Sequence, residues 1–220
     1  MSPPRVLALG AHPDDVEIYC LGLLLKLRAA GWEIGWAVAT DGQAGLPQGA
    51  AGDLRRREAR DAGARVGVEP ILLGFEDGGM SGGPDELHAV RQAVRDFAPT
   101  VIVAPHPADY HPDHRILSRL AADACPPGTL LLYADTMLGQ GNAPALHVDV
   151  SAFHAEKRAA LAAHASQAAP AFAPMFETWA RFRALHCGVV GAESGEGYTP
   201  VESAANLRAS RQLHAALLAG

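Results

Sequence analysis

The chain has 220 residues, of which 49% are apolar, so a single α/β domain over residues 1–220 is expected, with a core that needs no disulfides. Its formal net charge of −6 argues against nucleic acid or an anionic membrane as the partner, because both attract basic surfaces. The N-terminal segment lacks a signal-peptide pattern, and no apolar run reaches the length of a membrane span, so we expect a cytoplasmic protein that is not bound to a membrane.

Predicted strands alternate with predicted helices along the chain. The strands are expected at residues 6–9, 34–39, 71–73 and 101–104, and the helices at residues 18–30, 54–66, 85–97, 116–122 and 202–218. This alternation predicts an α/β fold, a Rossmann-like three-layer sandwich with a mostly parallel sheet between two layers of helices. The last helix is amphipathic, and we expect it to contribute to the contacts of a homo-oligomer.

Clusters of polar residues follow the first and fourth predicted strands. Sheets of this kind bind ligands outside the carboxyl ends of their strands. The first cluster is His12-Pro13-Asp14-Asp15-Val16-Glu17, and the second runs from His106 to His114. Both clusters therefore lie where proteins of this fold class bind their ligands.

The first cluster contains four ionisable groups within six residues. Adjacent carboxylates in a cleft repel each other, and a divalent cation would compensate their charge. Because side chains on an irregular turn diverge, one of Asp14 and Asp15 can be a metal ligand and the other a base. Alternatively, the cluster is a solvated acidic turn that caps the next helix, although capping explains one Asp and does not explain His12.

The second cluster ends in His111-Pro112-Asp113-His114, ahead of a helical stretch. A helix that begins near Pro112 would place His114 in its first turn. Two histidines with an Asp between them suit one metal ligand, one free imidazole and one carboxylate that orients an imidazole. The alternative is a surface loop with unrelated histidines.

The two clusters together supply three protein ligands and leave an open position, which is typical of a catalytic zinc site. Such a site activates water, and the spare Asp and His can then act as base and as acid or oxyanion donor in amide hydrolysis. Two other readings stay open. Two histidines and a carboxylate also describe a non-haem iron oxygenase, and a sugar-binding or regulatory protein could retain a vestigial site.

The motifs resemble those of one family. Ala11-His12-Pro13-Asp14-Asp15-Val16-Glu17 and His111-Pro112-Asp113-His114 look like the two signatures of the LmbE-like (PIG-L) N-acetylglucosaminyl deacetylases, which include the deacetylases of mycothiol and bacillithiol biosynthesis. The resemblance extends to Arg55-Arg56-Arg57-Glu58-Ala59, to Phe75-Glu76-Asp77-Gly78-Gly79-Met80 and to the stretch from Val148 to Gln167.

The resemblance implies a role for individual residues. It implies that His12, Asp15 and His114 bind zinc, with ferrous iron as the alternative ion inside the cell. It also implies that Asp14 is the general base, that His111 stabilises the oxyanion or protonates the leaving nitrogen, and that Asp113 orients His111. Arg55 and Asp77 fall where the family contacts substrate hydroxyls. The implied partner is a small-molecule acetylated amino sugar or its conjugate, and the implied reaction is attack of a zinc-bound water on its N-acetyl group.

This chain departs from the family pattern at two places. After Glu17 the family usually has small residues and glycines, whereas this chain has Ile18-Tyr19-Cys20-Leu21-Gly22. Many members also have Tyr-Ala-Glu followed by an aromatic residue where this chain reads Gly197-Tyr198-Thr199-Pro200-Val201-Glu202. Trp179 belongs either to the core or an interface, or to a platform on which a sugar ring stacks.

Overall fold

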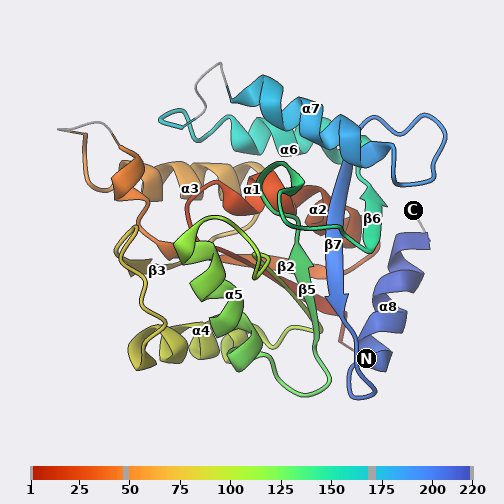
Figure 1. Ribbon diagram of the computed structural model, residues 1–220, viewed down its shortest axis with the longest axis horizontal. Helices are drawn as coiled ribbons and strands as arrows, with labels where there is room; N and C mark the ends of the chain where they lie inside the picture. The colour runs from red at the N-terminus through yellow and green to blue at the C-terminus, as the bar shows by residue number, and fades with distance from the viewer. Residues whose placement is uncertain (1, 47–49, 168–171, 219–220) are drawn as a thin grey trace.

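The computed structural model describes residues 2–46, 50–167 and 172–218, and these residues form a seven-stranded sheet in the order β3-β2-β1-β4-β5-β7-β6 (Figure 1). The strands are β1 (Arg5–Gly10), β2 (Glu33–Thr40), β3 (Ile71–Phe75), β4 (Val101–Ala104), β5 (Leu130–Ala134), β6 (Leu146–Asp149) and β7 (Gly195–Val201). Strands β1 to β5 are parallel, whereas β7 runs antiparallel to β5 and β6. The predicted mostly parallel sheet is confirmed.

Helices cover both faces of the sheet, which gives the expected three layers. Figure 1 shows α4 and α5 on one side and α1, α2, α3, α6 and α7 on the other. The helices are α1 (Asp15–Tyr19), α2 (Leu21–Ala29), α3 (Leu54–Arg65), α4 (Pro84–Phe97), α5 (Pro112–Ala124), α6 (His154–Leu161), α7 (Ala173–Ala184) and α8 (Leu207–Leu218). Short 3₁₀ turns η1 (Gln43–Gly45), η2 (Met137–Gly139) and η3 (Ser151–Phe153) lie between them.

Strand β1 is buried on both faces of the sheet. Its side chains alternate between the faces: Val6 and Ala8 join the apolar cluster under α2 and α8, while Leu7 and Leu9 join the cluster under α4 and α5. All four are at most 4% exposed. A strand buried on both faces holds the loop that follows it in a fixed position, and that loop contains His12.

The predicted helix over residues 18–30 is divided into α1 and α2 at Cys20, whose φ of −148° is not helical. The Glu196 carboxylate, on β7, accepts hydrogen bonds from the backbone N–H groups of Gly22 (2.9 Å) and Leu23 (2.7 Å) at the start of α2. These donors would otherwise be unsatisfied at a buried helix end. The break depends on a residue 174 positions away, so it was absent from the local pattern.

The C-terminal helix begins at Leu207, later than predicted, because Asn206 holds the preceding turn through hydrogen bonds with Ser203 N–H and the Val201 carbonyl. Its apolar face, with Ala209 and Leu213, packs into the core of its own domain. The amphipathic pattern that suggested oligomer contacts is therefore explained within one chain. Homo-oligomerisation remains a prediction.

None of the helices in the described residues has the length and apolar character needed to span a bilayer.

Candidate metal centre

The candidate centre lies at the carboxyl ends of β1 and β4, which are paired neighbours in the sheet. The loop after β1 contains His12 and leads into α1, whose first residue is Asp15. The loop after β4 leads into α5, which begins at Pro112 and has His114 in its first turn, as predicted. Two segments 102 residues apart therefore meet at one edge of the sheet.

Three of the predicted ligand atoms converge. His12 Nδ1 lies 3.3 Å from His114 Nε2 and 3.5 Å from Asp15 Oδ2, and His114 Nε2 lies 3.2 Å from Asp15 Oδ2. Ligands at zinc bond lengths of about 2.0–2.2 Å in tetrahedral directions lie about 3.3–3.6 Å apart. The donor set and its spacing therefore fit a zinc ion bound by these three atoms.

The outward-facing ring nitrogens of both histidines meet carboxylates. His12 Nε2 lies 3.1 Å from Asp77 Oδ1 and 3.3 Å from Asp113 Oδ2, and His114 Nδ1 lies 3.3 Å from Asp109 Oδ2. A carboxylate at the outer nitrogen fixes the tautomer so that the inner nitrogen presents its lone pair to a metal. Asp109 was not identified from the sequence, although an acidic residue shortly before His111 was available as a signal.

The electrostatics of the cluster favour a cation. Burial lowers the pKa of His12, but hydrogen bonds to Asp15 and Asp77 outweigh it and raise that pKa to about 11. Burial likewise lowers the pKa of His114, while the Asp15 charge and a hydrogen bond to Asp109 raise it to about 9. Burial raises the pKa of Asp15, yet the neighbouring histidines hold it well below its usual range. The carboxylates thus attract positive charge, which a dication would supply in place of protons.

His111 is the third imidazole at the centre, with its ring centroid 4.5 Å from that of His12. The backbone N–H of Asp113 donates to His111 Nδ1 (3.2 Å), so His111 caps α5. Because Nδ1 accepts this bond, the ring proton of the neutral imidazole lies on Nε2. Burial, His12 and His114 all lower the pKa of His111, which favours the neutral form. One nitrogen each of His12, His111 and His114 lie within 4.8 Å of one another.

Asp113 occupies a different place from the one expected. The prediction was that its carboxylate orients His111, but that carboxylate contacts His12 Nε2 and accepts from the Gly78 N–H (2.8 Å). Its contact with His111 is made by the backbone N–H instead. Asp113 is 1% exposed in the first turn of α5, and its carboxylate lies between the loops that follow β1 and β3.

Asp14 and Asp15 diverge, as the sequence suggested. Asp14 has a φ of 111°, a left-handed conformation that costs about 1–3 kcal/mol in a non-glycine residue. The turn directs Asp15 toward the histidines and Asp14 toward the cavity and Arg55. Burial raises the pKa of Asp14 to about 7, against the lowering effect of the Arg55 charge. A carboxylate with a pKa near neutrality suits a general base.

Arg55 and Asp77, the predicted substrate contacts, both line the cavity and both already have protein partners. Arg55 is 4% exposed and pairs with Asp14 Oδ2 at 3.1 Å. Asp77 holds His12 Nε2 and also accepts from the Ala44 N–H (3.0 Å). The structure therefore brings both to the centre, and their contact with substrate remains a prediction.

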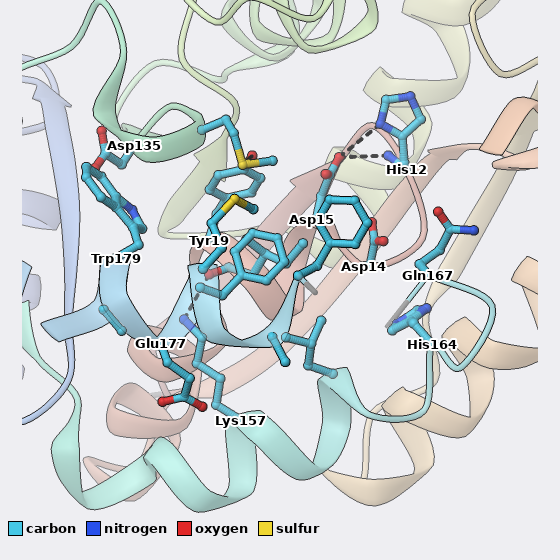
Figure 2. A pocket seen from close by; sticks show the side chains of 18 of the residues that line it. His12, Asp14, Asp15, Tyr19, Asp135, Lys157, His164, Gln167, Glu177 and Trp179 are labelled. Atoms are coloured by element: carbon cyan, nitrogen blue, oxygen red, sulfur yellow. Dashed lines mark hydrogen bonds and ion pairs between the residues drawn. The ribbon is translucent and has the colours of Figure 1, made fainter. Parts of the chain in front are cut away.

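A cavity of about 680 Å³ opens over the centre, within the range used for small-molecule ligands. Figure 2 shows His12, Asp14 and Asp15 on one side of it and Trp179 and Asp135 on the other. Two buried pairs that the sequence did not reveal lie beside it: His164 Nε2 with Glu17 Oε1 (2.8 Å), and Lys157 Nζ with Glu196 Oε1 (2.5 Å). Each joins residues far apart in sequence, so no local pattern indicates them.

Solved structures confirm the fold. N,N'-diacetylchitobiose deacetylase from Pyrococcus horikoshii is 24% identical, with a TM-score of 0.79 over 90% of this chain and 83% of its own. The 4-carboxy-2-hydroxymuconate hydratase GalB from Pseudomonas putida is 18% identical, with a TM-score of 0.81 over 91% of this chain and 97% of its own. Since one fold houses a deacetylase and a hydratase, the fold alone does not identify the reaction.

Sequence comparisons identify the family. The 1D-myo-inositol 2-acetamido-2-deoxy-alpha-D-glucopyranoside deacetylase of Nakamurella multipartita is 31% identical over 234 residues, covering 75% of this chain and 80% of that protein. The family described as PIG-L, GlcNAc-PI de-N-acetylase, matches residues 7–125, which include both histidine clusters. The resemblance seen in the two motifs is confirmed: the chain belongs to the PIG-L family of GlcNAc-PI de-N-acetylases.

Proposed function

We propose that this protein is a zinc-dependent N-deacetylase that hydrolyses the N-acetyl group of an N-acetylglucosamine-type amino sugar or its conjugate. The observation that supports this most is the convergence of His12 Nδ1, Asp15 Oδ2 and His114 Nε2 at tetrahedral spacing. Asp14, beside this cluster, lines the same cavity and is available as a base. Relatives named as deacetylases of acetylated amino sugars support the substrate class.

The chemistry divides between the ion and the protein. When bound, zinc lowers the pKa of water toward neutrality and polarises the amide carbonyl. Asp14 accepts the proton of the attacking water as the new C–O bond forms. His111 donates its Nε2–H to the carbonyl oxygen as negative charge develops there. The proton held by Asp14 then passes to the leaving nitrogen as the C–N bond breaks, which yields acetate and a free amine.

The other residues of the centre have positioning roles in this proposal. Asp77 and Asp113 orient His12, and Asp109 orients His114, through the contacts described above. Arg55 holds Asp14 in place. Asp113 also fixes the tautomer of His111 through its backbone N–H, so Nε2 carries the proton that the oxyanion needs.

One experiment tests the function and separates it from the alternatives. The purified protein is analysed for metal and incubated anaerobically with a panel of N-acetylated amino sugars, while acetate and free amine are measured. We expect equal amounts of both products, loss of activity after chelation, and recovery on addition of zinc. A requirement for oxygen would indicate an oxygenase. Tight sugar binding by the zinc-loaded protein without acetate release would indicate a binding protein and reject the proposal.

A further inference from the structure

The cavity continues well beyond the metal centre, and its far wall is apolar. Four side chains from three separate elements line it: Tyr19 at the end of α1, Met137 in η2, and Phe176 and Trp179 on α7. We call these four residues the apolar arm. Tyr19 connects the arm to the centre, because its ring lies edge-on to His114 with centroids 6.1 Å apart. Its hydroxyl lies 3.8 Å from Met137 Sδ.

The opposite end of the cavity is polar. Gln167 Nε2 donates to the Gly45 carbonyl (3.0 Å), and Arg55 and Asp77 line the same region. In Figure 2, Gln167 and Trp179 lie at opposite ends, with Tyr19 and Asp15 between them. The reacting atoms would therefore sit between a polar end and an apolar end. The hydroxyls of a sugar suit the polar end, whereas the apolar end offers them few hydrogen-bond partners.

The charged groups near the apolar arm are already paired within the wall. Asp135 accepts from Arg183 Nε at 2.6 Å. Glu177 lies 2.9 Å from His154 Nε2 and 2.8 Å from Arg158 Nε. Because these charges satisfy one another, the surface they leave for a ligand at this end is dominated by hydrocarbon and aromatic faces.

Trp179 is held rigidly. The Arg183 guanidinium lies 4.3 Å from the centre of its ring system, and Phe182 stacks on it with centroids 5.4 Å apart. The indole also packs against Gly139, where any side chain would collide with it. An aromatic surface that is fixed before binding loses little conformational entropy when a ligand arrives. This is the arrangement expected of a binding wall.

We propose that the apolar arm binds an alkyl or aryl group carried by the N-acylated amino sugar, so that preferred substrates are amphiphilic. This inference rests on the proposed function and names its substrate class. The test therefore covers two attachment points for this group, the anomeric oxygen and the amide carbonyl. Burial of each methylene gives up to about fourfold in affinity. A six-carbon chain should therefore raise kcat/KM at least tenfold after binding costs are subtracted.

Two pairs of compounds test this with the zinc-loaded enzyme. The methyl and hexyl glycosides of N-acetylglucosamine differ at the anomeric oxygen, and N-acetyl- and N-hexanoyl-glucosamine differ at the carbonyl. Free amine is measured throughout. We expect a rise of tenfold or more in kcat/KM in one pair, mainly through a lower KM, and the pair that responds identifies the attachment point. No rise in either pair would overturn the inference.

Variants locate the effect. Trp179→Ala should reduce the kcat/KM advantage of the six-carbon compound in the responding pair to less than threefold. Leu185→Ala should retain this advantage, because Leu185 follows α7, is 80% exposed and is not among the cavity-lining residues. An undiminished advantage in Trp179→Ala would reject the arm as the binding surface. Should that variant fail to fold, calorimetric titration of the wild type gives a second measurement with the products of the responding pair. These are methyl and hexyl glucosaminide for the glycosides, and acetate and hexanoate for the acyl compounds. Equal affinities within that pair would overturn the inference.

Failure of the inference can be distinguished from failure of the proposed function. No free amine from any compound, the methyl glycoside included, rejects the deacetylase assignment itself. Deacetylation of the methyl glycoside without a hexyl or hexanoyl advantage rejects the apolar arm alone.

Discussion

The Arg55 guanidinium lies 3.1 Å from the Asp14 carboxylate and also donates to the carbonyl of Pro13. An arginine from α3 thus fixes both the side chain of the proposed base and the turn that presents it. Since Asp14 adopts a left-handed backbone conformation, it needs such support from outside its own loop. The contact makes Arg55 a positioning residue whose effect should be visible in the pH dependence of catalysis.

Replacement of Arg55 by Met should move the acid limb of the kcat/KM profile to higher pH, by about one unit or more. Burial raises the pKa of Asp14 to about 7 and the Arg55 charge opposes that rise, so removal of the charge raises the pKa further. A base works only when deprotonated, so the variant needs a higher pH. Arg55→Lys keeps the charge and should shift less. Arg56→Met, one residue along α3, is the matched control and should leave the profile unchanged. If the acid limb does not shift in Arg55→Met, the Arg55 charge does not set the pKa of Asp14.

Asp14→Asn should lower kcat by a factor of about 100 or more while zinc stays bound at one equivalent. The amide keeps the shape of the carboxylate and cannot accept the proton of the attacking water. Metal content by elemental analysis and turnover by free-amine release are measured on the same preparation. Loss of the metal together with activity would show instead that Asp14 is a ligand.

The sequence predicted where the two histidine clusters lie, because the patterns that indicate their positions involve only neighbouring residues. The continuous apolar run from Val6 to Leu9 identified a buried strand, and the rule on strand ends then placed His12 at the edge of the sheet where the structure has it. Pro112 marked the start of a helix that holds His114, and the structure confirms it.

The parts that the sequence could not supply depend on contacts between distant segments. The Asp113 carboxylate contacts His12 across 101 residues of sequence, and Glu196 binds the start of α2 across 174 residues. The antiparallel β7–β6 edge was likewise missed, since β7 contains two glycines and a proline and lacks a clear strand pattern. Side-chain partners of this kind follow from the fold and not from spacing.

Asp109→Asn should weaken zinc binding by about 10- to 100-fold without abolishing it. Asp109 Oδ2 lies 3.3 Å from His114 Nδ1, and an amide at this position no longer supplies the charge that enforces the ligand tautomer. Competition with a chromogenic chelator measures the affinity. Asp61→Asn, an exposed carboxylate on α3, is the control and should bind zinc as the wild type does. If Asp109→Asn binds zinc as tightly as the wild type, Asp109 does not support zinc binding.

The His164–Glu17 pair should stabilise the fold in a pH-dependent way. His164 is fully buried and its Nε2 lies 2.8 Å from Glu17 Oε1. Burial lowers the pKa of His164, but the hydrogen bond and charge of Glu17 outweigh it and raise that pKa. A raised histidine pKa contributes stability that is fully present below the unfolded value of about 6.5 and is lost as the pH rises through the folded value.

A double-mutant cycle of His164→Gln, Glu17→Gln and the double variant measures this coupling by urea unfolding in the presence of a chelator. Each single variant should lose about 3–5 kcal/mol at pH 6, because it leaves a buried charge without its counter-charge. The double variant should lose less than the sum of the two. The coupling energy should be larger at pH 6 than at pH 9, since deprotonation of His164 removes the charge that Glu17 stabilises. A coupling that is equal at the two pH values would contradict the charged pair, because a neutral imidazole gives a coupling that does not change with pH.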